Sequence, residues 1–204
     1  MVELFIKGRM FMWPLLAAAI IGVAFIFERL WTLSRATINT RKFLDKVTVA
    51  LREGGVTAAA DVCAKTRGPI ASIFHAGLMK ADRGVSEVEK AIEGAGSIEM
   101  SFLERGLVWL ATIANIAPML GFLGTVSGMI NAFEAIARAG DIEPSLVASG
   151  ISEALITTAT GLAIAIPIQA AHNFFVSKID KLVIDMEESS TALLDTLVEM
   201  GTAK

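Results

Sequence analysis

The chain contains three long stretches without a charged side chain, at residues 10–27, 106–133 and 154–177. A helix needs about 20 apolar residues to cross a hydrocarbon core of roughly 30 Å. The first stretch therefore barely reaches across, and the other two cross with residues to spare. The first stretch could be a signal peptide, but it ends in bulky Phe25, Ile26 and Phe27 rather than in a small-residue cleavage site. We therefore expect it to be retained as a helix. The pattern predicts a polytopic membrane protein with three transmembrane helices.

The charges between these stretches predict an orientation. Residues 28–105 hold 12 Lys or Arg, crowded near the first stretch, whereas residues 134–153 hold one Arg and four acids. Since cytoplasmic loops are enriched in Lys and Arg, residues 28–105 and the tail at 178–204 are expected in the cytoplasm. Residues 1–9 and the short loop at 134–153 are then periplasmic.

The cytoplasmic segments are expected to be helical, which makes the fold class all-α. Glycines at Gly54, Gly55, Gly68 and Gly84 divide the long segment into pieces of helical length. Ser86 and Glu89 have the spacing of a capping box. The tail has helical spacing of its apolar residues, which predicts that the third span continues as an amphipathic cytoplasmic helix: Leu182, Met186, Leu193, Leu197 and Met200.

Composition narrows the function classes. The chain is 54% hydrophobic and 19% charged. Its net charge of −3 provides no excess of positive charge for binding nucleic acid. Cys63 is the single cysteine, so neither a disulfide framework nor a thiolate metal site is expected. The sequence has no phosphate loop, metal-ligand cluster or nucleophile–base pair. We therefore expect no enzyme, no metal and no cofactor.

Small residues follow one face of the second span. Gly121, Gly124 and Gly128 are three and four residues apart, which lets a neighbouring helix approach closely. Pro118 in this span and Pro167 in the third each remove a backbone hydrogen bond and can bend the helix. These residues are candidates for helix packing.

The third span opens with Glu153 above a group of hydroxyls: Thr157, Thr158 and Thr160. Thr157 lies four residues from both Glu153 and Gly161, so the three share a helix face. A carboxylate at a span entrance above hydroxyls is a candidate lining for an ion path. The alternative is that Glu153 only lies at the aqueous boundary, where it favours the helix N-terminus.

The second and third spans resemble the MotA/TolQ/ExbB proton-channel family, in its ExbB/TolQ branch. The residues that carry the resemblance are 116–129 and 151–167, together with Asn173. The resemblance implies a homopentamer in the bacterial inner membrane. It further implies two copies of a single-span ExbD- or TolR-like partner that carries a membrane aspartate. A threonine from each of two helices would line the proton path, here Thr125 and Thr158, with Glu153 at the head of the third span.

The expected function is therefore that of the pore or stator subunit of a motor that couples proton flow to mechanical work. The work could be TonB-dependent uptake or Tol-Pal envelope maintenance, through a TonB- or TolA-like force transducer. Membrane lipids are the other expected partners. A non-conducting scaffold would explain the glycines but not the hydroxyls below Glu153. A small secondary transporter would be expected to show inverted repeats, and none stands out in the sequence.

Overall fold

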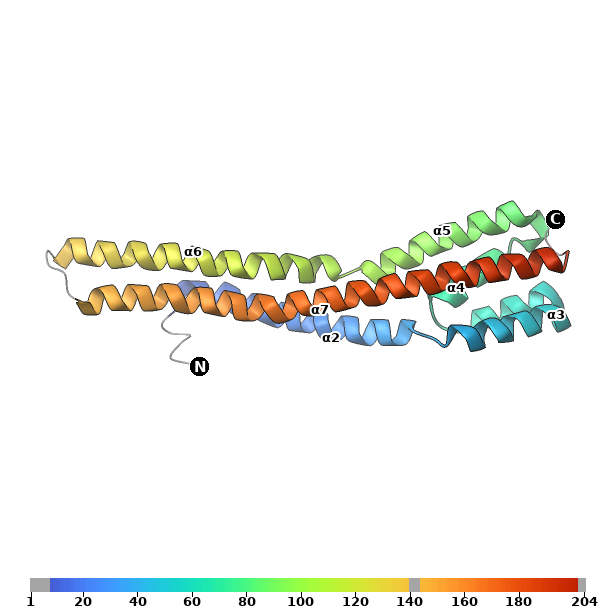
Figure 1. Ribbon diagram of the computed structural model, residues 1–204, viewed down its shortest axis with the longest axis horizontal. Coiled ribbons are helices and arrows are strands. Elements are labelled where there is room, and N and C mark those ends of the chain that lie inside the picture. Colours follow the sequence, from blue (N-terminus) through green and yellow to red (C-terminus); the bar gives the residue numbers. More distant parts are fainter. Residues whose placement is uncertain (1–7, 140–143, 202–204) are drawn as a thin grey trace. The chain divides into compact units, whose positions relative to one another are not determined.

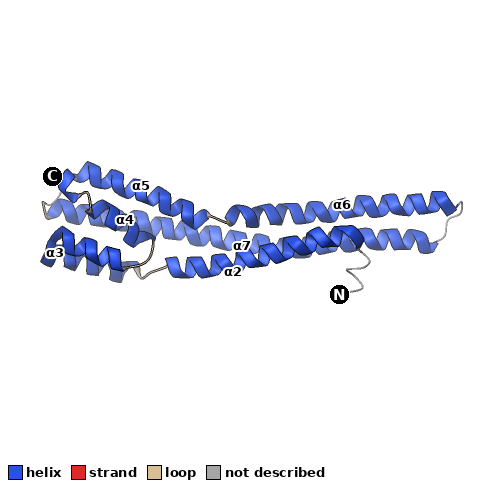
Figure 2. Cartoon of the chain, turned by 180° about the vertical axis from the view of Figure 1, so that it is seen from behind, coloured by secondary structure: helices blue, strands red, loops and turns tan. Residues whose placement is uncertain are grey.

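The computed structural model describes residues 8–139 and 144–201. Within those residues every regular element is a helix, as Figure 2 shows, which confirms the all-α prediction. The elements in chain order are η1 (Arg9–Phe11), α2 (Met12–Ala36), α3 (Thr40–Lys65), α4 (Pro69–Leu78), η2 (Ala81–Arg83), α5 (Val85–Glu104), α6 (Leu107–Ala139) and α7 (Pro144–Glu199).

Three stretches of helix are long and apolar enough to cross a membrane, and they include α2 and nearly all of α6 and α7. Each of these helices runs past the charge-free stretch that predicted it, because a charged side chain limits burial in hydrocarbon without ending a helix. Two parts of the predicted periplasmic segments, residues 1–7 and 140–143, lie outside the described residues.

The chain divides into two compact units. Unit 1 comprises Met1–Glu28 and Gly106–Phe174, and unit 2 comprises Arg29–Arg105 and Phe175–Lys204. In Figure 1, α6 and the first half of α7 belong to unit 1, whereas α3, α4 and α5 belong to unit 2. Unit 1 thus holds the predicted spans apart from residues 175–177, and unit 2 holds most of the predicted cytoplasmic residues.

Unit 1 buries small residues and exposes large apolar ones. Ala117 on α6 and Ala165 on α7 share a buried cluster with Met12 and Leu15 of α2. The exposed apolar side chains of the three helices include Trp13, Phe27, Met119, Phe122 and Ile166, each about two thirds accessible. An apolar surface of this kind is typical of a membrane-facing or partner-facing region.

Unit 2 has a core of larger side chains. Helix α4 packs against both α3 and α5, and the rings of Phe43 and Phe74 lie 5.6 Å apart between α3 and α4. The second half of α7 contributes a buried apolar stripe at helical spacing, with buried Ser189 and Ser190 between Met186 and Leu193: Phe175, Ile179, Leu182, Met186, Leu193 and Leu197. The predicted amphipathic continuation of the third span is therefore confirmed. Met200 differs, since it follows the end of α7 and is 36% exposed.

Glycines interrupt the helices of unit 2 where the sequence predicted breaks. Gly55 has φ +72° inside α3, and Gly68 and Gly84 directly precede α4 and α5. The predicted capping box at Ser86 and Glu89 is wrong. Gly84, with φ +99°, starts α5 at Val85 without a side-chain cap, so Ser86 already lies inside the helix.

Candidate functional site

The backbones of α6 and α7 come into direct contact in unit 1. Gly121, Gly124 and Gly128 are all buried and face α7. A Cβ atom on Gly128 would lie 3.0 Å from the carbonyl oxygen of Gly150, and one on Gly161 would lie 2.5 Å from the carbonyl oxygen of Ala117. No side chain larger than hydrogen fits at Gly161 without moving α6 away from α7.

Thr158 bridges this contact with a hydrogen bond. Its Oγ1 donates to the carbonyl oxygen of Gly121 at 3.0 Å, from α7 to α6. Thr158 is only partly buried, so its oxygen lies at the edge of the interface rather than inside it. A threonine hydroxyl has one proton to donate and two lone pairs to accept with. Thr158 can therefore accept a further hydrogen bond while it holds α6.

Thr157, the neighbouring threonine, is fully buried. Its Oγ1 donates to the carbonyl oxygens of Glu153 at 3.2 Å and Ala154 at 2.9 Å. Its side chain fills the space beside Gly124, where a Cβ atom would collide with it. The hydroxyl is thus bonded to its own helix and enclosed by α6.

Thr125 and Thr160 lie at partly exposed positions. Thr125 donates to the carbonyl oxygen of Phe122, and Thr160 donates to that of Ile156 at 2.8 Å. Both hydroxyls bond back to their own helix, an arrangement common for threonine in apolar helices. Each oxygen keeps lone pairs that can accept a proton donor from outside the chain.

Glu153 lies one turn before Thr157 on the buried side of α7. Its side chain is buried, at 7% exposed. The two prolines do not interrupt their helices, since Pro118 lies within α6 and Pro167 within α7. Among the described residues no cluster of His, Cys, Asp and Glu could hold a metal ion.

The role of Gly150 in this region was not anticipated from the sequence. Gly150 extends the close contact toward Ala132 of α6, where a Cβ on Gly150 would lie 2.5 Å from the alanine Cβ. The spacing of small residues at 150, 154, 157 and 161 could have revealed this extension. In the last turns of α7 within unit 1, Gln169 donates from Nε2 to Oδ1 of Asn173 at 2.9 Å. His172 Nδ1 lies 3.3 Å from the same oxygen.

The sequence matches the model of the MotA/TolQ/ExbB proton channel family over residues 65–188. A putative biopolymer transport protein ExbB homolog from Methanothermobacter thermautotrophicus is 33% identical over 186 residues, which cover 91% of this chain and 66% of the relative. The ExbB-like 1 protein of Synechocystis is 36% identical over 166 residues, which cover 79% of this chain and 65% of the relative. The chain thus spans about two thirds of the length of both relatives.

The Tol-Pal system protein TolQ of Pseudomonas aeruginosa is 39% identical over 102 residues, which cover 50% of this chain and 44% of the relative. Among solved structures, that of C. jejuni MotAB contains a chain with a similar fold. The TM-score is 0.66 at 16% identity, over 92% of this chain and 75% of that chain. At this identity the likeness concerns the fold alone.

Proposed function

This chain belongs to the MotA/TolQ/ExbB proton channel family, and we propose that it is the pore-forming stator subunit of a proton-driven motor of the ExbB/TolQ type. The observation that carries the proposal is the Thr158 hydroxyl, which holds α6 at its contact with α7 and still offers a partly exposed acceptor. Relatives named ExbB-like and TolQ support this branch, and both the Ton-type and the Tol-type process are compatible with it.

The proposed channel requires several copies of the chain. Three spans leave little room to enclose a path, and the accessible apolar faces of α6 and α7 suit contact with lipid or with other subunits. A homopentamer around two copies of an ExbD/TolR-like single-span subunit is the proposed assembly. We place it in the cytoplasmic membrane, with the N-terminus outside and unit 2 in the cytoplasm.

The partner's membrane aspartate would be the group that gains and loses the proton, since the described spans offer no better candidate than the enclosed Glu153. Thr158 and Thr125 would accept from the protonated carboxyl or donate to the ionised one. Moving one charge across a 100 mV potential releases about 2.3 kcal/mol, which can bias a stepwise motion. Glu153 and Thr160 would line the same path, and Thr157 would hold α7 beside Gly124 of α6.

A non-conducting scaffold is the second candidate. The hydrogen bonds from Thr125, Thr157 and Thr160 to carbonyls of their own helices are also what a purely structural role would produce. The two candidates differ in what the loss of one hydroxyl should do. A scaffold should keep its function when a methyl group replaces the hydroxyl, whereas a proton path should lose its flux.

The test is proton flux in liposomes that contain the chain co-purified with an aspartate-bearing single-span partner. Thr158→Val keeps the side-chain volume and removes the hydroxyl, and Thr158→Ser keeps the hydroxyl as the matched control. We expect flux to need the partner, to fall at least about tenfold in the valine variant and to survive in the serine variant, with the assembled mass unchanged. Equal flux in both variants would exclude Thr158 from the path, and an assembled wild type without flux would favour the scaffold.

A further inference from the structure

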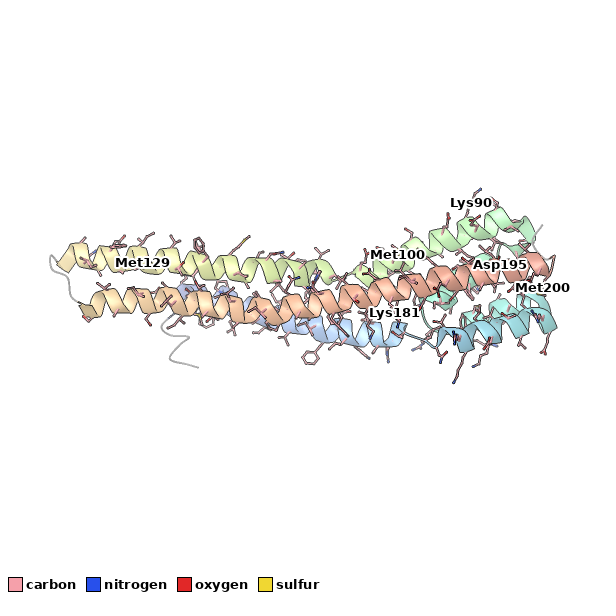
Figure 3. All side chains as sticks on the ribbon, viewed as in Figure 1. Lys90, Met100, Met129, Lys181, Asp195 and Met200 are labelled. Carbon is pink, nitrogen blue, oxygen red and sulfur yellow. The ribbon has the colours of Figure 1, made fainter. Side chains whose placement is uncertain are left out.

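Helices α5 and α7 of unit 2 form a groove of about 420 Å³ with an apolar floor and an acidic rim. The floor includes Ile92, Met186 and Leu194, and the rim carries Glu89, Glu93 and Glu187. No cationic side chain is among the described residues that line it. The nearby Lys90, which points away from α5 in Figure 3, is paired with Glu87 at 3.0 Å.

A surface of opposite character lies on α3 of the same unit. The buried side of α3 carries Phe43, Val47 and Leu51. Its outward side carries Val49, which is 51% exposed. The exposed charged residues around it are two acids, Asp45 and Glu53, and four cations: Arg41, Lys42, Lys46 and Arg52. We call this set with Val49 the basic face. An apolar residue on a face of net positive charge complements an apolar floor with a carboxylate rim.

The groove and the basic face also agree in length. On α5 the groove runs from Glu89 to Met100, and the basic face runs from Arg41 to Arg52. Each covers eleven residue steps, or about 16 Å of helix at 1.5 Å per residue. Two helical surfaces of equal length and opposite charge can pair along their whole extent.

The two surfaces lie on different sides of unit 2. Helix α4 packs against both α3 and α5, and α3 and α5 lie at opposite edges of the unit in Figures 1 and 2. They cannot meet within one chain. A head-to-tail contact requires complementary surfaces on opposite sides of one subunit. Such contacts form a closed ring when the rotation between neighbouring subunits returns to the first subunit.

We propose that the acidic groove of one copy receives the basic face of the neighbouring copy, so that unit 2 forms its own ring contact. This inference rests on the proposed function, because it presupposes a ring of subunits. Glu93 and Glu187 pair with the cations of the neighbour, and its Val49 covers the apolar floor. The charge pairs select the partner surface, and the apolar contact supplies the burial.

Disulfide trapping between copies tests the contact in the full-length chain in membranes. Cys63→Ala removes the single cysteine, and Val49→Cys is then combined with Ser97→Cys, which lines the groove. The matched control combines Val49→Cys with Val198→Cys, an exposed position on α7 that is not among the groove residues. We expect an intermolecular ladder for the groove pair at a yield about tenfold above that of the control pair.

Charge reversal supplies the second measurement. Glu93→Lys with Glu187→Lys should lower the yield of the groove pair about tenfold, and adding Lys42→Glu with Arg52→Glu should restore it. Asp195→Lys, at the position labelled on α7 in Figure 3, should leave the yield unchanged, because Asp195 does not line the groove.

The outcomes separate this inference from the proposed function. A ring of normal mass whose groove pair forms no more disulfide than the control pair overturns the inference and leaves the channel proposal intact. A groove cysteine that links instead to a separate co-purified basic protein also overturns it. A wild-type chain that stays monomeric and conducts no protons with the partner overturns both proposals.

Discussion

A single methyl group at Gly161 should force α6 and α7 apart. In the native contact the Cβ of Gly161→Ala would lie 2.5 Å from the carbonyl oxygen of Ala117 and 3.2 Å from the Cα of Gly121. Both atoms belong to the backbone of α6, so neither can rotate away as a side chain could. Relief requires a shift of the whole helix.

The size of that shift sets the energetic cost. An ordinary carbon–oxygen contact begins near 3.4 Å, so the helices must separate by about 0.9 Å at this point. A gap of this size forfeits a quarter to a half of each dispersion contact along the interface. The same shift would stretch the hydrogen bond from Thr158 to Gly121 from 3.0 Å to beyond bonding range.

Overpacking costs about 1–3 kcal/mol, and the lost interhelical hydrogen bond adds about 0.6 kcal/mol. The better helix propensity of alanine returns up to about 1 kcal/mol. We therefore expect Gly161→Ala to lower the free energy of unfolding by about 2 kcal/mol. Reversible unfolding in mixed micelles at increasing SDS fraction, followed by circular dichroism, measures this difference.

Gly94→Ala is the matched control. Gly94 lies in α5, and a Cβ atom there would meet nothing within 4 Å. The substitution should be neutral or should stabilise by up to about 1 kcal/mol, because alanine loses less backbone entropy than glycine. If Gly161→Ala proved as stable as Gly94→Ala, the reasoning that α6 and α7 touch through their backbones would be refuted.

Two further predictions concern unit 2. Arg29 is 5% exposed and donates from Nη1 to the carbonyl oxygen of Leu103 at 3.2 Å, so Arg29→Met should cost about 1.5–3 kcal/mol in the same SDS assay. The exposed Arg35, which lies over the ring of Trp31 at 4.7 Å, should lose less than about 1 kcal/mol as Arg35→Met, and equal losses would contradict the role given to Arg29. Burial raises the pKa of the Cys63 thiol from 9.0 to about 11, so N-ethylmaleimide should label the folded chain far more slowly than the unfolded chain at pH 7. Rapid labelling of the folded protein at pH 7, measured by mass spectrometry, would contradict the raised pKa. Since the folded pKa is the higher one, the thiol's contribution to stability is complete below pH 9 and is lost as the pH rises toward 11.

Local features of the sequence were sufficient for much of the fold. The three charge-free stretches predicted the helices that are long and apolar enough to span, because hydropathy depends on composition alone. Gly55 and Gly84 predicted breaks, because glycine has no Cβ and adopts a positive φ more readily than other residues. The capping box failed although its spacing was right, because the conformation of Gly84 started the helix two residues before the position that Ser86 would need as a cap.

For the candidate site, local features of the sequence were not sufficient. Sequence spacing grouped Thr157 and Thr158 on the third span and placed Gly121 on the small-residue face of the second, but adjacent residues point about 100° apart on a helix. Which threonine faces α6 depends on how closely the two helices approach, and that distance is a property of both. The structure encloses Thr157 beside Gly124 and leaves Thr158 to donate across to Gly121.

The sequence by itself determined which segments are apolar, where the helices of unit 2 break and which small and hydroxyl residues share a region. Those properties follow from side-chain transfer energies and backbone sterics, which act over a few neighbouring residues. The tertiary structure alone decided which hydroxyl bridges α6 and α7 and which charged surfaces of unit 2 lie on opposite sides. Those outcomes require distances between residues far apart in the chain, and local periodicity carries no information on such distances.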